Sequence, residues 1–246
     1  MRLINFTILL TALFMITSCA SRKDVIYFQN VDQIVGKGVD VKYNTIKEND
    51  RLSILVTAED KEVIKSFSVG GQGNGSESGM FYTVDTDGNI VFPYLGAIHV
   101  KGLTRLDLIA QLRKDLSKYI KDPIVNVTLM NFQVTVLGAT KGSVLEFENN
   151  DRPTILEALA KSGDINITAK RNDILVIRED NGVRSLYKLD VRDANIVNSP
   201  GYYLAQNDII YVEPNRSGIQ GNKSTWYLSV GMTVITIALA VINLVK

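Results

Sequence analysis

The sequence predicts an α+β protein with two small mixed units, each mostly strands with one helix, and a C-terminal transmembrane helix. Three observations support this fold class. Short stretches of alternating apolar and polar residues mark strands through the middle of the chain. Two capped helical segments interrupt these strands, and a long uncharged apolar run ends the chain. The 246 residues suffice for one or two domains with their own cores.

The C-terminal apolar run extends from Trp226 to Val245 without a charged residue, and Lys246 follows it. About 20 residues at a rise of about 1.5 Å each span about 30 Å, the thickness of a bilayer's hydrocarbon layer. Trp226 and Tyr227 at one end and Lys246 at the other are expected as interfacial anchors. We therefore expect a membrane helix over residues 225–246, entered through a linker at residues 215–224.

Small and polar residues form one stripe on this predicted helix, because they are spaced three or four positions apart. The stripe consists of Ser229, Thr233, Thr236, Ala240 and Asn243. Lipid cannot satisfy such a stripe, so it is expected to line a pore or a seam between identical helices. The alternative is an ordinary anchor, in which the hydroxyl groups bond to their own helix backbone.

The N-terminus carries a targeting segment over residues 1–18. Arg2 is followed by an apolar stretch too short for a good membrane span. The segment ends in Ile16-Thr17-Ser18-Cys19, which matches the bacterial lipobox, so Cys19 is expected to be lipidated and to begin the mature chain. The alternative is a plain signal peptide with an incidental cysteine. With one cysteine in the chain, no internal disulfide is expected.

Composition and motifs argue against nucleic-acid binding, catalysis and metal binding. Lys and Arg number 27 and Asp and Glu 26, so the net charge of +1 provides no basic surface for nucleic acid. His99 is expected on a sheet face, and Asp85-x-Asp87-Gly88 reads as a turn rather than a calcium loop. Ser185 and Lys188 lie three apart on a predicted strand and therefore face opposite ways. No catalytic residue, metal or cofactor is expected.

The first unit, residues 44–133, follows a polar N-terminal arm at residues 19–43 that is expected to be extended. A hairpin is expected to turn at Asp87-Gly88, and a helix is expected over residues 103–120 with Thr104 as its cap. Its predicted apolar face consists of Leu106, Ile109, Leu112, Leu116 and Tyr119. The expected strands are residues 51–58, 81–84, 90–93, 124–129 and 133–137.

The second unit, residues 134–214, contains one short helix. Thr154 and Glu157 form a capping box at its start, and Gly163 is placed to end it. Asn181-Gly182 marks a hairpin. The expected strands are residues 174–178, 183–189, 202–204 and 209–212.

The order of these motifs resembles the outer-membrane polysaccharide export lipoproteins that serve capsule and exopolysaccharide secretion. That family shows a D-G-x-I turn, P-x-x-G, G-L-T, a helix and D-P-x-V-x-V. This chain has Asp87-Gly88-Asn89-Ile90, Pro93-Tyr94-Leu95-Gly96, Gly102-Leu103-Thr104 and Asp122-Pro123-Ile124-Val125-Asn126-Val127 in the same order. The later stretches TILEALAKSGDI, ILVIRED and YYLAQNDIIYVEP resemble the family's soluble-ligand-binding β-grasp domain. Residues 138–142 depart from the family's usual G-E-V-x-x-P-G.

The resemblance implies a homo-oligomeric ring, octameric in the family's best-known members, with its body in the periplasm and one helix per subunit crossing the outer membrane. The cargo would be capsular or extracellular polysaccharide, and an inner-membrane copolymerase would be a partner. The runner-up is a periplasmic polysaccharide-binding adaptor ring that hands the polymer to a separate outer-membrane β-barrel.

Overall fold

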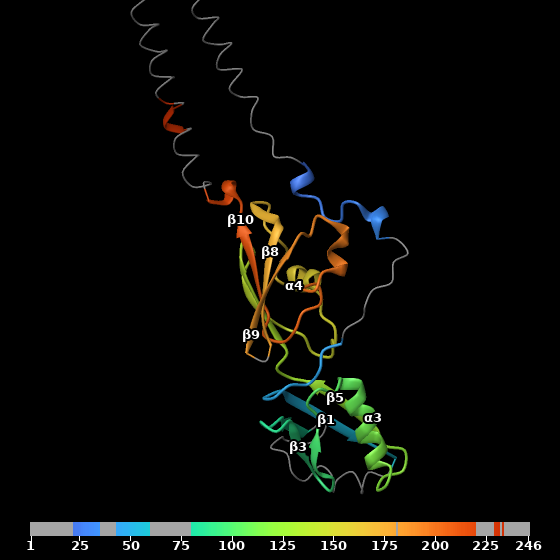
Figure 1. The fold of residues 1–246 in the computed structure, drawn as a ribbon. Coiled ribbons are helices and arrows are strands. Elements are labelled where there is room, and N and C mark those ends of the chain that lie inside the picture. Colours follow the sequence, from blue (N-terminus) through green and yellow to red (C-terminus); the bar gives the residue numbers. More distant parts are fainter. Residues whose placement is uncertain are drawn as a thin grey trace, which may run out of the picture.

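The computed structural model describes residues 22–34, 43–59, 80–180, 182–219, 229–231 and 233. They form two units joined end to end, and each unit has a hydrophobic core of its own (Figure 1). Leu129 is partly buried and packs against both cores. A mixed α/β fold with several sheets is therefore confirmed.

The N-terminal unit, residues 43–130, has a three-stranded antiparallel sheet in the order β2-β1-β5, a separate hairpin of β3 and β4, and one helix. Its elements are β1 (Arg51–Thr57), β2 (Met80–Thr83), β3 (Asn89–Phe92), β4 (Gly96–His99), α3 (Arg105–Leu116) and β5 (Ile124–Leu129). The helix lies along β5 and buries one face in the core.

Helix α3 begins with the predicted cap. The Thr104 hydroxyl accepts a hydrogen bond from the Asp107 N–H at 3.1 Å, and the Asp107 carboxylate accepts one from the Thr104 N–H at 3.3 Å. The buried residues are Leu108, Leu112 and Leu116, whose four-residue spacing places them on one stripe. The predicted apolar face was wrong in part, because Leu106 is 53% and Tyr119 56% exposed.

The hairpin predicted between residues 81–84 and 90–93 is wrong, although its turn is present. Asp85 Oδ1 accepts hydrogen bonds from the N–H groups of Asp87 and Asn89 at 3.0 and 2.7 Å. Strand β2 pairs with β1, and β3 pairs with β4 instead. A second turn at Tyr94 and Gly96, both with positive φ, folds β4 directly back onto β3.

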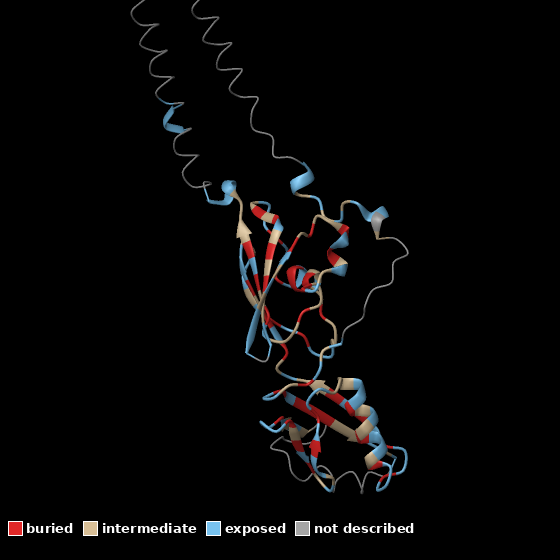
Figure 2. Cartoon of the chain, in the orientation of Figure 1, coloured by how far each residue is buried: buried red, intermediate tan, exposed pale blue. Residues whose placement is uncertain are grey.

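The C-terminal unit, residues 132–214, is a five-stranded mixed sheet in the order β7-β6-β10-β8-β9. Its elements are β6 (Gln133–Gly138), β7 (Ser143–Glu146), α4 (Ile155–Lys161), β8 (Ala169–Asp180), β9 (Val183–Leu189), the 3-10 helix η3 (Ala194–Asn198) and β10 (Ile209–Pro214). Strand β10 runs parallel to β6 and antiparallel to β8. The helical elements cover one face of this sheet, and the buried side chains of the unit lie between that face and the helices (Figure 2).

The capping box of α4 is confirmed, with hydrogen bonds between Thr154 and Glu157 in both directions. Gly163 follows the helix with φ +87°, as the prediction of its end requires. The predicted strand at residues 202–204 is wrong: this segment makes only one isolated bridge, between Thr154 and Tyr203, because it turns toward β10.

The described part of the N-terminal arm packs on the C-terminal unit. It contains the 3-10 turns η1 (Arg22–Asp24) and η2 (Val31–Gln33). The N–H groups of Phe28 and Gln29 donate to the carbonyls of Val191 and Arg192 at 3.2 and 2.5 Å. The arm and the end of β10 both lie at the end of this unit that is remote from the N-terminal unit (Figure 1).

Both predicted membrane attachments lie largely outside the described residues. The targeting segment 1–18 and Cys19 are outside them, as are most positions of residues 225–246. Within the described ranges, no helix reaches the length and apolarity that a bilayer crossing requires. The C-terminal transmembrane helix is thus not supported by the structure and stays a prediction.

Candidate functional site: the junction between the two units

The junction is centred on an ion pair between the start of α3 and the loop that precedes α4. Arg105 Nε and Nη2 donate to the two carboxylate oxygens of Asp151 at 2.6 and 2.8 Å. The two side chains are only 23% and 22% exposed. The hydrogen bond to Asp151 raises the pKa of the Arg105 guanidinium, with burial opposing and the charge of Asp151 adding to the shift. This fork geometry fixes orientation as well as distance.

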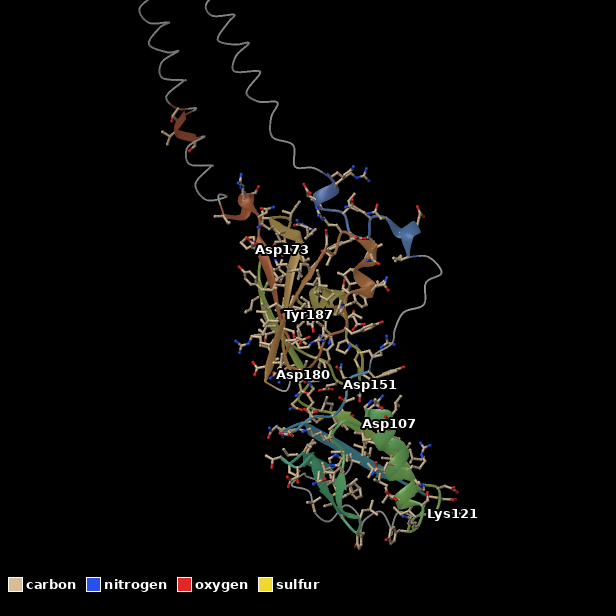
Figure 3. The ribbon with its side chains drawn as sticks, in the orientation of Figure 1. Asp107, Lys121, Asp151, Asp173, Asp180 and Tyr187 are labelled. Carbon is tan, nitrogen blue, oxygen red and sulfur yellow. The ribbon has the colours of Figure 1, made fainter. Side chains whose placement is uncertain are left out.

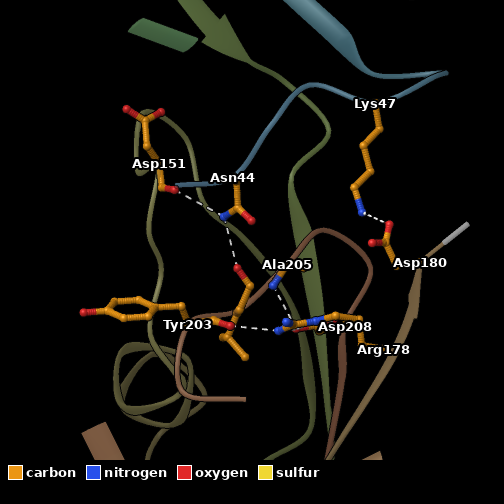
Figure 4. A network of polar contacts seen from close by, with 9 residues as sticks. Asn44, Lys47, Asp151, Arg178, Asp180, Tyr203, Ala205 and Asp208 are labelled. Carbon is orange, nitrogen blue, oxygen red and sulfur yellow. Dashed lines mark hydrogen bonds and ion pairs between the residues drawn. The ribbon is translucent and has the colours of Figure 1, made fainter. Parts of the chain in front are cut away.

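Asn44 makes a second connection across the junction (Figure 4). Its Nδ2 donates to the backbone carbonyls of Asp151 and Leu204 at 3.2 and 3.1 Å. The Asn44 backbone N–H also donates to the Asp151 carbonyl at 3.2 Å. The chain segment that enters the N-terminal unit is therefore held against two loops of the C-terminal unit. A cavity of about 30 Å³ remains between these groups.

A groove of about 650 Å³ opens beside the junction, between the tip of the β8–β9 hairpin and residues 47–50. Figure 3 shows Asp151 and Asp180 at the end of the C-terminal unit that faces the N-terminal unit, and Asp173 at the opposite end. Lys47 reaches across to Asp180 at 2.7 Å, but both side chains are exposed, so this pair contributes little stability.

Asp50 is the buried acid of the groove wall, with an exposed fraction of 1%. Its carboxylate accepts a hydrogen bond from the Lys47 N–H at 2.8 Å. Burial raises the pKa of Asp50, and the Lys47 N–H, the Gln206 side chain and the Lys47 charge oppose that shift.

A second buried pair supports the junction from within the C-terminal unit. Arg178 donates from Nε and Nη2 to Asp208, with a shortest contact of 2.6 Å, and Asp208 is 0% exposed. Arg178 Nη2 also donates to the Tyr203 carbonyl at 2.8 Å, and Asp208 accepts from the Ala205 N–H at 2.8 Å (Figure 4). Burial lowers the pKa of Arg178, but the hydrogen bonds and charge of Asp208 outweigh it and raise that pKa overall. The pair fixes the loop that Asn44 binds.

These groups suit a structural joint. Three acid–base pairs lie at or beside the junction: Arg105–Asp151, Lys47–Asp180 and Arg178–Asp208. Among the residues that the structure describes, no three His, Cys, Asp or Glu side chains gather as metal ligands. His99 lies on β4 and its Nδ1 is 3.1 Å from Asn89 Oδ1, which agrees with the predicted sheet-face position.

Of the residues predicted to matter at the membrane, the structure describes Ser229 and Thr233. Thr233 Oγ1 donates to the backbone carbonyls of Ser229 and Val230 at 3.0 and 2.8 Å. This is the local bonding expected of an ordinary anchor. The remaining predicted positions lie outside the described residues: Cys19, Trp226, Tyr227, Thr236, Ala240, Asn243 and Lys246.

Sequence reasoning missed the junction. Arg105 and Asp151 are 46 positions apart and belong to no shared motif. The polar run Asn149-Asn150-Asp151-Arg152 before the capping box reads as an ordinary loop, so no local signal marked the junction.

Comparison with known proteins identifies the N-terminal unit. Residues 39–130 match the model of a family described as polysaccharide biosynthesis/export protein. We call these residues the export domain, after the family that they resemble. The resemblance inferred from the motifs is thereby confirmed.

Two curated relatives extend the similarity beyond the export domain. The chain is 26% identical over 195 residues to the "EPS I polysaccharide export outer membrane protein EpsA" of Ralstonia solanacearum, covering 75% of this chain and 51% of the relative. It is 29% identical over 153 residues to the protein of the same name from Ralstonia nicotianae, covering 58% of this chain and 39% of the relative. The chain thus spans about half or less of the length of these relatives.

Proposed function

We propose that this protein is an outer-membrane lipoprotein that assembles into a homo-oligomeric channel and exports capsular or extracellular polysaccharide from the periplasm to the cell surface. The observation that carries the proposal is the export domain at residues 39–130, in a chain similar to two proteins named as polysaccharide export outer membrane proteins. The Arg105–Asp151 and Arg178–Asp208 pairs at the junction support a structural role for this part of the chain.

The proposed organisation keeps the predicted boundaries. Residues 1–18 form the signal peptide, 19–43 the arm, 44–133 the export domain, 134–214 a β-grasp domain, 215–224 a linker and 225–246 the membrane helix. Cys19 carries the lipid. Trp226, Tyr227 and Lys246 set the depth of the helix. The stripe that includes Thr233 and Thr236 lines the lumen or the seam between helices. Polysaccharide is the cargo, and an inner-membrane copolymerase supplies it.

The experiment that tests the channel uses the lipidated protein purified from outer membranes. Negative-stain images and single-channel conductance in planar bilayers are expected to show a ring and discrete openings. Replacing Thr233 and Thr236 with Leu is expected to impair assembly and surface polysaccharide, with Leu228→Ile on the opposite face as a matched control. Intact assembly and unchanged polysaccharide in the Thr variants would argue against the stripe.

The alternative is a periplasmic adaptor ring that binds polysaccharide and hands it to a separate outer-membrane β-barrel. One observation is in keeping with it: the Thr233 hydroxyl bonds to the carbonyls of Ser229 and Val230 in its own segment, so it needs no neighbouring helix as a partner. A ring that forms but conducts no current, and that co-purifies with a β-barrel partner, would establish this second function instead.

A further inference from the structure

Arg152 packs against two tyrosine rings at the junction between the units. Its Cζ lies 4.4 Å from the centre of the Tyr203 ring and 5.1 Å from the centre of the Tyr43 ring. Aromatic rings attract a guanidinium that lies over them, and its N–H groups remain available for hydrogen bonds. Figure 4 shows Tyr203 on the side of the junction away from the Lys47–Asp180 pair, so this Arg152 site is separate from the groove.

Arg152 differs from the other arginines of the junction because it has no acid partner. Arg105 is paired with Asp151, and Arg178 is paired with Asp208. Among the residues that the structure describes, Arg152 belongs to no ion pair, and its Nε is buried without a hydrogen-bond partner. A partly buried charge without a counter-charge is costly, and an anionic ligand would offset that cost.

The backbone beside each tyrosine is held by bonds that do not involve this guanidinium. Asn44, the neighbour of Tyr43, donates from its backbone N–H and its Nδ2 to the Asp151 carbonyl, both at 3.2 Å. The Tyr203 carbonyl accepts from Arg178 Nη2 at 2.8 Å. The two rings therefore start from fixed points of the chain. A guanidinium already packed against them loses little freedom when it binds a ligand.

The Arg152 site is accessible from solvent. Tyr43 is 48% exposed, and Arg152 and Tyr203 are partly exposed. Because Nε is the buried nitrogen, the Nη1–Nη2 edge on the other side of the guanidinium is the one that a ligand can reach. Such an edge donates two parallel hydrogen bonds to a carboxylate. The exposed Tyr43 ring beside it offers an apolar surface on which the C–H face of a sugar ring can pack.

We propose that Arg152, together with Tyr43 and Tyr203, binds a carboxylate group of an acidic saccharide. A uronic acid has both parts that the site would recognise, a carboxylate for the guanidinium and a C–H face for a tyrosine ring. The proposed cargo is a polysaccharide, which favours a saccharide over an acidic protein as the ligand. The inference rests on that proposed function, and it names the chemical class of the cargo and a residue that contacts it.

Isothermal titration calorimetry of the full-length lipidated protein in detergent tests this inference. The probes are tetragalacturonate, an acidic oligosaccharide, and maltotetraose, a neutral one. Wild type is expected to bind tetragalacturonate about tenfold or more tightly than maltotetraose, and Arg152→Gln is expected to lose that preference. Added salt should weaken the binding of tetragalacturonate to wild type more than to Arg152→Gln. Arg113→Gln is the matched control, because it removes the same charge from an exposed side chain near the end of α3.

Arg152→Lys keeps the charge but not the fork of N–H groups, so it is expected to recover only part of the affinity. Circular dichroism and the melting temperature check that each variant is folded. Equal binding of tetragalacturonate to wild type and Arg152→Gln, or no binding to wild type, overturns the inference. Tighter binding of tetraglutamate than of tetragalacturonate also overturns it, and would assign the site to an acidic protein partner.

Single-channel conductance separates this inference from the proposed channel. A wild-type ring that conducts but does not bind tetragalacturonate keeps the channel and overturns the saccharide site. A wild-type protein that binds tetragalacturonate through Arg152 but forms no conducting ring overturns the channel and keeps the site.

Discussion

Removing the Arg105–Asp151 ion pair would show how strongly the two units are coupled. The pair joins α3 of the export domain to the loop before α4 through bonds of 2.6 and 2.8 Å. We consider the variants Arg105→Met and Asp151→Asn and their combination. Asp151→Asn removes the charge and one of the two oxygens that accept from Arg105, but it preserves the backbone carbonyl that accepts from Asn44.

The size of the coupling free energy between Arg105 and Asp151 depends on how far the two side chains are buried. Exposed ion pairs contribute about 0.2–1 kcal/mol, whereas breaking a buried pair costs about 3–5 kcal/mol. The Arg105 and Asp151 side chains are 23% and 22% exposed, between these cases. A coupling free energy of about 2 kcal/mol is therefore expected from the double-mutant cycle. Each single variant should lower the melting temperature by about 4–8 °C if the described body unfolds cooperatively.

The assay is urea unfolding of the full-length protein in detergent, followed by circular dichroism. The control cycle uses Arg184→Met and Glu179→Gln, whose side chains are 70% and 58% exposed and pair at 2.9 Å. That cycle should give a coupling free energy below about 0.5 kcal/mol. A similarly small coupling for Arg105 and Asp151 would show that the ion pair does not hold the units together.

Three further changes probe other parts of the structure. Gly138→Ala should destabilise the fold by about 2 kcal/mol or more in urea unfolding, because φ is +97° and the added Cβ would lie 2.1 Å from the Val212 carbonyl oxygen. The control is Gly182→Ala, which should cost only about 1 kcal/mol because Gly182 has a φ of +75° but open space around it. Burial raises the pKa of Asp50 above its usual value of 3.8, so the stability linked to its proton is complete below that value and is lost as the pH rises through the raised pKa. Over that rise Asp50→Asn should gain stability relative to wild type, and a stability difference that does not change with pH would contradict this. Burial, and after it the hydrogen bond to Asp164, raise the pKa of Tyr27 to about 12. The stability that the neutral Tyr27 hydroxyl contributes is therefore complete below the usual tyrosine pKa of 10.0 and is lost as the pH approaches 12. The difference in unfolding free energy between wild type and Tyr27→Phe should shrink over that interval.

Local structure was predictable where a few adjacent residues decide it. Thr104 and Thr154 cap α3 and α4 as expected, because a cap depends on a hydroxyl and an N–H three residues later. The turn at Asp85 was also found from its residues. The pairing of the strands on either side of this turn was not predicted, because strand partners depend on the whole sheet. Strand β2 pairs with β1, and β3 pairs with β4.

Local signals could not predict the junction, the buried face of α3 or the contact made by the arm. Arg105 reads as an ordinary first residue of a helix and Asp151 as a loop residue, until the fold brings them together. The predicted apolar face of α3 included Leu106 because a helical period admits neighbouring stripes, and only packing selects the one centred on Leu112. The arm read as an extended connection, since nothing near Tyr27 names its partner Asp164.

The loop between α4 and β8 makes hydrogen bonds to the arm and to the residue that follows β10. Tyr27 bonds to Asp164, and the Asn215 N–H donates to the Thr168 carbonyl at 2.7 Å. The arm also bonds to Val191 and Arg192, and β10 pairs with β6 and β8, so a pull between the arm and the end of β10 would load the C-terminal unit first. Such a pull would reach the export domain only through its contacts with the C-terminal unit, among them those of Arg105 and Asn44.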